Sequence, residues 1–186
     1  TWRGHRDLPW FSAIPTRTAA ALATDRIRLG MLVASPNFRH PLTLAKEIVT
    51  LDDISAGRLT LGIGQGSMGW DATMMGAEPW SPRERSERFR EFVEPTDLLL
   101  REPETTYLGN FYSAREARMY PGCVQSPRVP IAIAASGRTG MRLAARFAET
   151  WVTTGSRARP GPIDAAQGTR DVRDQIDVLE EACIES

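Results

Sequence analysis

Short apolar runs alternate with longer amphipathic stretches along most of the chain. The runs at 27–34, 59–64 and 129–135 are rich in Ile, Val, Leu and Ala, and these runs, like a further one at 150–154, have the length of strands. Strands that alternate in this way with amphipathic stretches are typical of parallel sheets with crossover helices. The sequence therefore predicts parallel strands that alternate with crossover helices.

Helical periodicity fills the intervals between the runs. Apolar residues at helical spacing predict helices at 16–24, from Pro41 to just before Gly57, at 82–101, around 141–148, and along the C-terminal stretch, where Val172, Ile176, Leu179 and Cys183 form the apolar stripe. A chain that opens on a helix without its own strand has the pattern of the middle of a repeating β/α fold. A closed eightfold barrel needs about 250 residues, so these units amount to roughly half of one.

Proline and glycine predict two interruptions of this pattern. Pro95 lies inside the helix at 82–101, where it removes a backbone hydrogen bond at a cost of roughly 3 kcal/mol, and we expect a kink or break there. Residues 102–129 carry three prolines and two glycines, which favours a long irregular loop with a hairpin around 106–112.

Composition narrows the class of protein. The 186 residues carry 23 Lys and Arg against 23 Asp and Glu, a balance that argues against a nucleic-acid partner. No apolar run approaches the roughly 18 residues of a membrane span, so we expect no membrane partner and a cytoplasmic protein. Cys123 and Cys183 lie far apart and are expected to be buried, reduced thiols. With only two histidines, we expect no metal site.

Residues 64–69 match G-x-G-x-x-G directly after a predicted strand. In a dinucleotide-binding fold this pattern opens a helix and is followed about 20 residues later by an acidic group that ends a second strand. Neither feature is evident here, since 70–80 is a loop rich in Met and Gly. A glycine-rich turn and a dinucleotide site remain the two interpretations of the pattern itself.

The turn at 135–140 joins a predicted strand to a predicted helix. Its backbone N–H groups, the Ser136 hydroxyl and Arg138 could face an anion such as a phosphate. The alternative is a plain serine cap on the helix.

Other polar residues have simpler interpretations. We expect His40, just before Pro41, to cap or pack against a helix start, and Asp52 and Asp53 to be solvated on different sides of their helix. The alternating Arg and Glu residues of 83–94 have the spacing of ion pairs on a solvated helix face.

Taken in order, several segments resemble the bacterial luciferase-like superfamily. They are RIRLG at 26–30, SPNFRHP at 35–41, LAKE at 44–47, LDDISAGRL at 51–59, GIGQG at 62–66, PIAIAASG at 130–137 and WVTTG at 151–155. The resemblance implies an α/β fold of the (β/α)8 TIM-barrel type. It further implies that 1–186 is a single luciferase-like domain, incomplete and truncated at both ends, which holds about barrel strands three to six.

The resemblance also implies a site at the carboxyl ends of the strands. A non-proline cis peptide at Leu32–Val33 would form a bulge that supports the cofactor ring, with Ser35 in the loop that follows. Gly64, Gln65 and Gly66 would contact the ring or its side chain, and the turn of Ala135, Ser136 and Gly137 would contact the phosphate-bearing tail. The family's polar catalytic residues are expected to precede Thr1, so no catalytic residue is assigned.

By that resemblance, the protein is an oxidoreductase that transfers hydride from reduced coenzyme F420 to a small organic substrate. One alternative is an FMN-dependent monooxygenase that activates oxygen, because both cofactors need an apolar ring pocket and a phosphate site. Another is a truncated barrel that binds flavin without turnover. The substrate is not identified, and association into a homodimer stays open.

Overall fold

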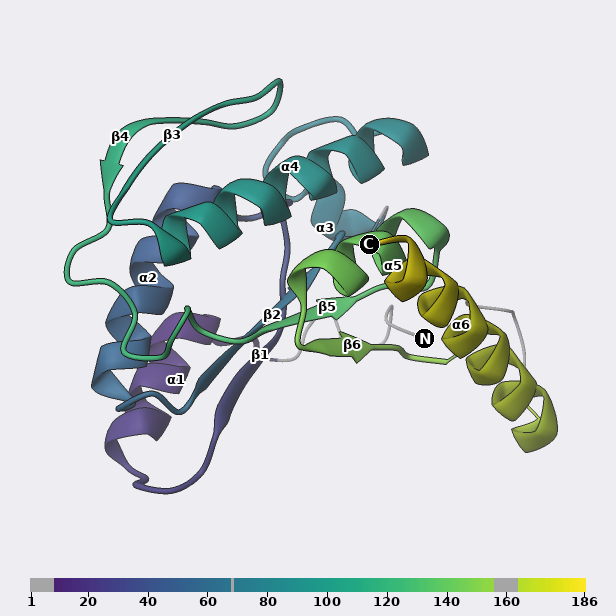
Figure 1. Cartoon of the computed structure of the whole chain (residues 1–186), viewed down its shortest axis with the longest axis horizontal. Helices are drawn as coiled ribbons and strands as arrows, with labels where there is room; N and C mark the ends of the chain where they lie inside the picture. Colours follow the sequence, from purple (N-terminus) through teal and green to yellow (C-terminus); the bar gives the residue numbers. More distant parts are fainter. Residues whose placement is uncertain (1–8, 68, 156–163) are drawn as a thin grey trace.

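The computed structural model describes residues 9–67, 69–155 and 164–186. Its main sheet is parallel and has the strand order β1-β2-β5-β6, with strands that run in chain order across the sheet (Figure 1). The strands are β1 (Leu29–Ala34), β2 (Leu59–Gly64), β5 (Ile131–Ala134) and β6 (Thr150–Val152). The predicted parallel α/β architecture is confirmed, and β2 has the predicted bounds.

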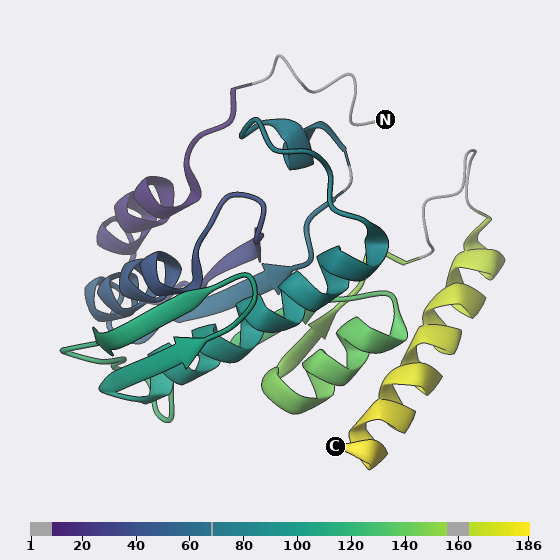
Figure 2. The same cartoon turned by 90° about the horizontal axis from the view of Figure 1, so that it is seen from above.

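Helices cover one side of this curved sheet (Figure 2). They are α1 (Ala13–Leu22), α2 (Pro41–Ile54), α4 (Pro82–Arg101), α5 (Arg138–Phe147) and α6 (Ala165–Glu185). The side chains of Met31, Leu61 and Ile63 are buried, whereas Leu32 is 68% exposed. Within the described residues the sheet is open, with β1 and β6 at its edges, and it forms no closed barrel.

Two helices begin with the caps that their sequences favour. The His40 Nδ1 atom accepts a hydrogen bond from the Leu42 N–H at 3.2 Å, and Pro41 fills the first position of α2, which confirms the expected capping role of His40. Helix α4 begins with a capping box in which Ser81 and Glu84 each accept from the other's backbone N–H. These caps fix where the helices after β1 and β2 begin.

Helix α4 continues through Pro95, so the expected break is wrong. The helix runs without interruption over 20 residues, and Pro95 is itself buried. Phe92 and Leu99 on either side of the proline are almost fully buried in the core. Burial of large apolar side chains stabilises a protein by about 1.5–3 kcal/mol each, which is enough to offset the hydrogen bond that proline removes.

The long connection between α4 and β5 contains the expected hairpin. Strands β3 (Glu104–Leu108) and β4 (Ser113–Arg118) pair antiparallel and lie against α4, away from the main sheet (Figure 1). The hairpin is longer than predicted because its strands extend beyond the turn at 109–112. A further short helix that the sequence did not predict, α3 (Trp70–Thr73), follows the β2 loop.

Asp52 is buried, which corrects the expectation that it is solvated. Its carboxylate accepts hydrogen bonds from the Val124 N–H at 2.8 Å, the Gln125 N–H at 3.1 Å and the Gln125 Nε2 atom at 2.8 Å. Asp53 is exposed, as expected. Successive residues of a helix point about 100° apart, so Asp52 falls beside the apolar stripe of α2 and Asp53 does not.

The two cysteines are less buried than predicted. Cys123 is half-buried and Cys183 is exposed on the last turn of α6. The buried positions of α6 are Gln175 and Ala182. Leu179 is partly buried against the core, whereas Ile176 and Cys183 are exposed, so the predicted apolar stripe is confirmed only in part.

Candidate functional site

Three of the parallel strands bring the predicted site residues to one edge of the sheet. Leu32, Val33 and Ser35 lie at or after the end of β1, Gly64 to Gly66 at the end of β2, and residues 135–137 after β5. Gly64 is in register with Ala134 on β5, so the loops that follow β2 and β5 start side by side. This edge is where ligands bind in parallel β/α folds.

β1 ends in a bulge. Its register with β2 shifts between Met31 and Ala34, and the Leu32–Val33 peptide bond is cis, as predicted. Leu32 is 68% exposed and Val33 is 39% exposed. The bulge therefore presents two aliphatic side chains at the edge where the strands end.

The glycines after β2 make room for this bulge and its loop. A Cβ atom on Gly64 would lie 2.6 Å from Val33 Cγ2, and one on Gly66 would lie 2.6 Å from Ser35 Oγ. Gly66 also has a φ of +82°, which side-chain-bearing residues rarely adopt. Both glycines are thus required by the close approach of the β1 loop.

The dinucleotide-fold interpretation of 64–69 does not agree with the structure. That interpretation requires the strand order to reverse beside the glycine loop, whereas here β1, β2, β5 and β6 follow in order. The loop also leads into α3, which has four residues, and not into a full crossover helix.

Two polar side chains of the predicted site are engaged by the protein. Gln65 Nε2 donates to Ser86 Oγ on α4 at 2.9 Å, so its amide group is directed toward the helix. Ser35 is 9% exposed and its Oγ atom accepts from the Asn37 N–H at 3.1 Å.

The turn after β5 leaves the start of α5 uncapped. Gly137 is the N-cap residue and no side chain bonds to the first turn, while Ser136 is exposed, so a serine cap is not formed. The N–H groups of a first helical turn have no partner within the helix and are suited to an anion.

Two side chains beside this turn are engaged by the protein. Arg138 is 3.3 Å from Glu181 on α6 and is directed toward that helix. Trp151 Nε1 donates to the Ala135 carbonyl at 2.9 Å and holds the turn from β6.

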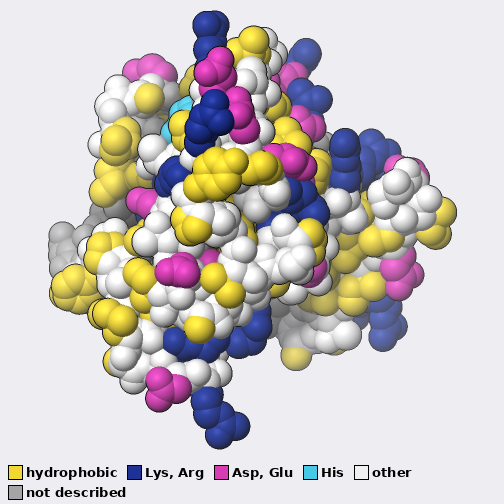
Figure 3. Space-filling view, turned by 60° about the vertical axis from the view of Figure 1, so that its left-hand side comes forward, with side chains coloured by type: hydrophobic (Ala, Val, Ile, Leu, Met, Phe, Trp, Pro, Cys, Tyr) yellow, Lys and Arg dark blue, Asp and Glu magenta, His cyan; other side chains and the backbone are white. Residues whose placement is uncertain are grey.

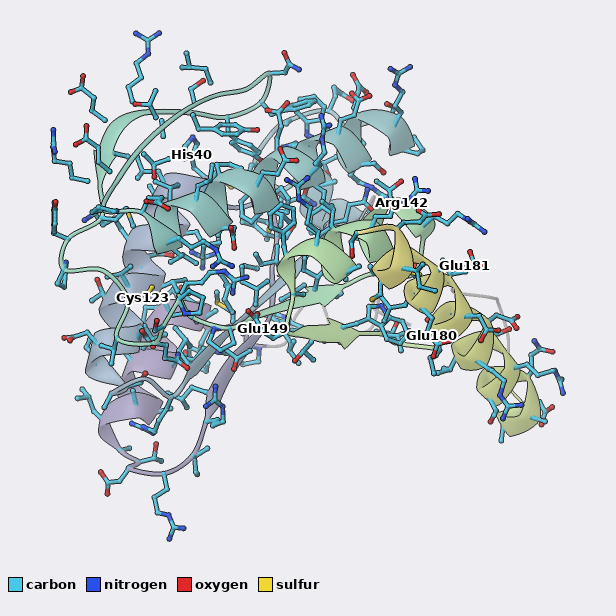
Figure 4. The ribbon with its side chains drawn as sticks, viewed as in Figure 1. His40, Cys123, Arg142, Glu149, Glu180 and Glu181 are labelled. Atoms are coloured by element: carbon cyan, nitrogen blue, oxygen red, sulfur yellow. The ribbon has the colours of Figure 1, made fainter. Side chains whose placement is uncertain are left out.

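Next to the β1 loop lies a cluster of aromatic rings and one arginine. His40 lies at the start of α2 (Figure 4). It packs edge to face against Tyr112, with 5.4 Å between ring centroids. Arg88 on α4 contacts the backbone of this loop and the side chain of Asn37. Arg88 is therefore partly buried and bound to the β1 loop, which corrects the interpretation of a fully solvated helix face, although Arg83 does pair with Glu87 on the exposed face as predicted.

Sequence reasoning missed the side chains that join the β1 and β2 loops. Asn37 Nδ2 donates to the Ser67 carbonyl and to an Asp71 carboxylate oxygen, both at 3.3 Å. The one signal for Arg88 was its position four residues before the buried Phe92, which places it on the inner side of α4.

Charged side chains of both signs are mixed with hydrophobic ones on the face of the molecule that Figure 3 shows. Among the described residues, no helix has the length and hydropathy needed to cross a membrane. In the same part of the chain, no three His, Cys, Asp or Glu side chains are grouped as metal ligands would be.

Known proteins share both the sequence and this architecture. The F420-dependent glucose-6-phosphate dehydrogenase of Beutenbergia cavernae is 36% identical over 150 residues, which cover 80% of this chain and 44% of that enzyme. Two solved structures superpose with a TM-score of 0.77, and each match covers 94% of this chain and 50% of the other. They are monooxygenase RslO1 from Streptomyces bottropensis, at 27% identity, and the coenzyme F420 dependent tetrahydromethanopterin reductase of Methanopyrus kandleri, at 25%.

The chain thus spans about half the length of these relatives. Residues 1–176 match the luciferase-like monooxygenase family, which agrees with the bulge, the open parallel sheet and the strand-end loops. The chain therefore belongs to the luciferase-like monooxygenase family.

Proposed function

We propose that this chain forms the F420-binding part of an oxidoreductase that transfers hydride from the reduced coenzyme to a small organic substrate in the cytoplasm. The observation that carries the proposal is the bulge at Leu32 and Val33, which presents exposed aliphatic side chains beside the side-chain-free Gly64. Relatives named as F420-dependent enzymes support the choice of coenzyme.

The residues present fit a flat ring with a phosphate-bearing tail. The bulge offers an aliphatic surface, and the uncapped first turn of α5 offers N–H donors for a phosphate. Strands β1 and β5 are separated by β2 alone, so the two features are about 10 Å apart across the sheet. One ligand with a planar ring and an anionic tail can contact both.

Each part of the chain then has a distinct role. When bound, F420 supplies the hydride that the reaction transfers. Leu32 and Val33 would hold the ring and exclude water from it, because burial of their apolar surface is favourable. The backbone after β5 holds the tail, and Trp151 keeps that turn in place through the Ala135 carbonyl. Together these contacts would orient the ring for hydride transfer.

FMN is the second candidate, since RslO1 is named as a monooxygenase. The aliphatic bulge and the anion-binding turn fit FMN by the same chemistry, and the function would then be oxygen activation. The third interpretation, a truncated barrel that binds a flavin without turnover, would keep the binding site and lose the reaction.

Fluorescence titrations of the purified chain with F420 and, in separate samples, with FMN test the proposal. We expect saturable binding of F420 that is weakened by Leu32→Gln and by inorganic phosphate. Leu22→Gln is the matched control, because Leu22 is also exposed, at 76%, but lies at the end of α1.

Each outcome of the titrations has a meaning. Binding of FMN alone would replace F420-dependent hydride transfer with the monooxygenase alternative. Failure of both to bind would overturn the proposed site in this chain. Equal effects of the two leucine variants would show that the bulge does not contact the ring.

A further inference from the structure

Arg88 connects α4 to the loop that follows β1. Its Nη2 atom donates to the Pro36 carbonyl, and its Nη1 atom lies 3.4 Å from Asn37 Oδ1. Residues 36 and 37 come directly after Ser35, in the loop between the bulge and α2. One guanidinium group thus holds both the backbone and a side chain of the loop that borders the proposed site.

Aromatic rings fix the position of this guanidinium. The Arg88 Cζ atom is 5.2 Å from the Trp80 ring centroid and 5.8 Å from that of Tyr112. Tyr112 is 7% exposed and packs in turn against Phe92, with ring centroids 5.8 Å apart. Cation–π contacts and a buried neighbour restrict the arginine to one place, which makes it a rigid support for the loop.

Asn37 passes this constraint on to the loop after β2. Its Nδ2 atom donates to the Ser67 carbonyl and to Asp71, each at 3.3 Å. The same atom would lie 2.7 Å from a Cβ on Gly66, so the two loops are in close contact. A shift of Asn37 would therefore move the Gly66 segment as well.

We infer that Arg88 is a positioning residue, which locks the β1 and β2 loops together and so sets the geometry of the cofactor site. The inference rests on the proposed function, and it assigns Arg88 no contact with the cofactor. An arginine is required because its planar group donates to two acceptors in fixed directions while it packs against rings. A lysine at this position would keep the charge and one donor but would lose the fixed geometry.

Amide hydrogen exchange of the chain without cofactor tests the lock directly. The N–H groups of Asn37 and Phe38 donate to Ser35 within this loop, so their exchange rates report its opening. In Arg88→Met we expect exchange at 37, 38 and 66–67 to rise about tenfold, as loss of a charged hydrogen bond implies, and to rise less in Arg88→Lys. Arg83→Met is the control, since Arg83 lies on the same helix with an 88% exposed side chain.

Cofactor titration of the same variants tests the consequence. We expect the dissociation constant to increase about tenfold in Arg88→Met and by less in Arg88→Lys, with Arg83→Met unchanged. If Arg88 acts through the loop, the effects of Arg88→Met and Asn37→Ala on binding are less than additive in the double variant. A purely structural role would lower overall stability without this coupling, which urea unfolding of each variant measures.

The outcomes separate this inference from the proposed function. If the wild-type chain binds neither cofactor, the proposed function fails, while the exchange experiment still decides whether Arg88 locks the loops. If the wild-type chain binds but Arg88→Lys exchanges and binds like the wild type, the positioning role is overturned and the proposed function stands. The lysine variant keeps the test valid should the methionine variant fail to fold.

Discussion

Gly62 on β2 lies so close to the carbonyl oxygen of Met31 on β1 that no side chain fits between them. A Cβ atom on Gly62 would be 2.0 Å from that oxygen and 2.8 Å from Leu32 Cδ2. Met31 is the last residue before the register shift of β1. The bulge that presents Leu32 is therefore accommodated by the missing side chain of a neighbouring strand.

Replacement of Gly62 by alanine should lower the free energy of unfolding by about 2–3 kcal/mol, because the Met31 carbonyl is backbone and can move only with the strand. Gly30→Ala is the matched control, since a Cβ there would meet nothing within 4 Å on the adjacent strand. We expect that control to change stability by less than about 0.5 kcal/mol. Urea unfolding of both variants measures the difference, and equal stabilities would show that the bulge adapts freely.

Removal of the Asp52 carboxylate should destabilise the protein far more than the same change at the neighbouring position. Asp52→Asn loses the charge that accepts three hydrogen bonds from Val124 and Gln125, where such bonds to a charged group contribute about 1.5–3 kcal/mol each, and the asparagine oxygen can still accept part of them. We expect a loss of about 2–4 kcal/mol. Asp53→Asn, at an exposed position, should change stability by less than about 0.5 kcal/mol in thermal or urea unfolding. Similar losses in both variants would contradict the role given to Asp52.

The hairpin should loosen at alkaline pH through Tyr107. Burial, together with the nearby charges of Glu94 and Glu91, raises the pKa of Tyr107 to about 12 from an ordinary 10.0. The unfolded chain then loses this proton at lower pH than the folded chain, so the contribution to stability is intact below pH 10 and is lost as the pH rises to about 12.

Urea unfolding at a series of pH values between 10 and 12 tests this sign, with Tyr107→Phe expected to lose less stability over that interval than the wild type. Tyr120→Phe, at a position that is 64% exposed, is the control and should follow the wild type. A wild-type protein that gains stability over this interval would show that the sign is wrong.

Hydrophobic periodicity predicted the bounds of strands and helices well where burial of apolar side chains alone determines those bounds. The bounds of β2 and α4 were correct because their apolar residues pack in the core, and core packing also lets α4 continue through Pro95. The first strand starts two residues later than predicted, since Ile27 is apolar but 61% exposed and lies outside the paired segment. A pattern of apolar residues cannot show which of them find a partner strand.

The site was predictable in outline and not in its supporting contacts. The position of the bulge came from a family resemblance, whereas Arg88 lies in a run of alternating charges in which its spacing from Phe92 is the one local signal that it faces inward. Its partners Pro36 and Trp80 are set by tertiary packing. The same is true of Asp52, because the N–H groups that donate to its carboxylate come from a loop about 70 residues away in the sequence.

The two cysteines should differ in the rate at which they react with a thiol reagent such as dithiobis(nitrobenzoic acid). Cys183 is exposed near the end of α6, whereas burial raises the pKa of the Cys123 thiol, which also donates to the Leu100 carbonyl at 3.5 Å. Since the thiolate is the reactive form, both access and ionisation favour Cys183.

At pH 8 we expect a fast phase that Cys183→Ser removes and a slow phase that Cys123→Ser removes. Addition of urea should convert the slow phase into a fast one, because unfolding exposes Cys123. A single fast phase for both thiols in the native protein would show that the loop around Cys123 opens readily, contrary to its packing beneath α4.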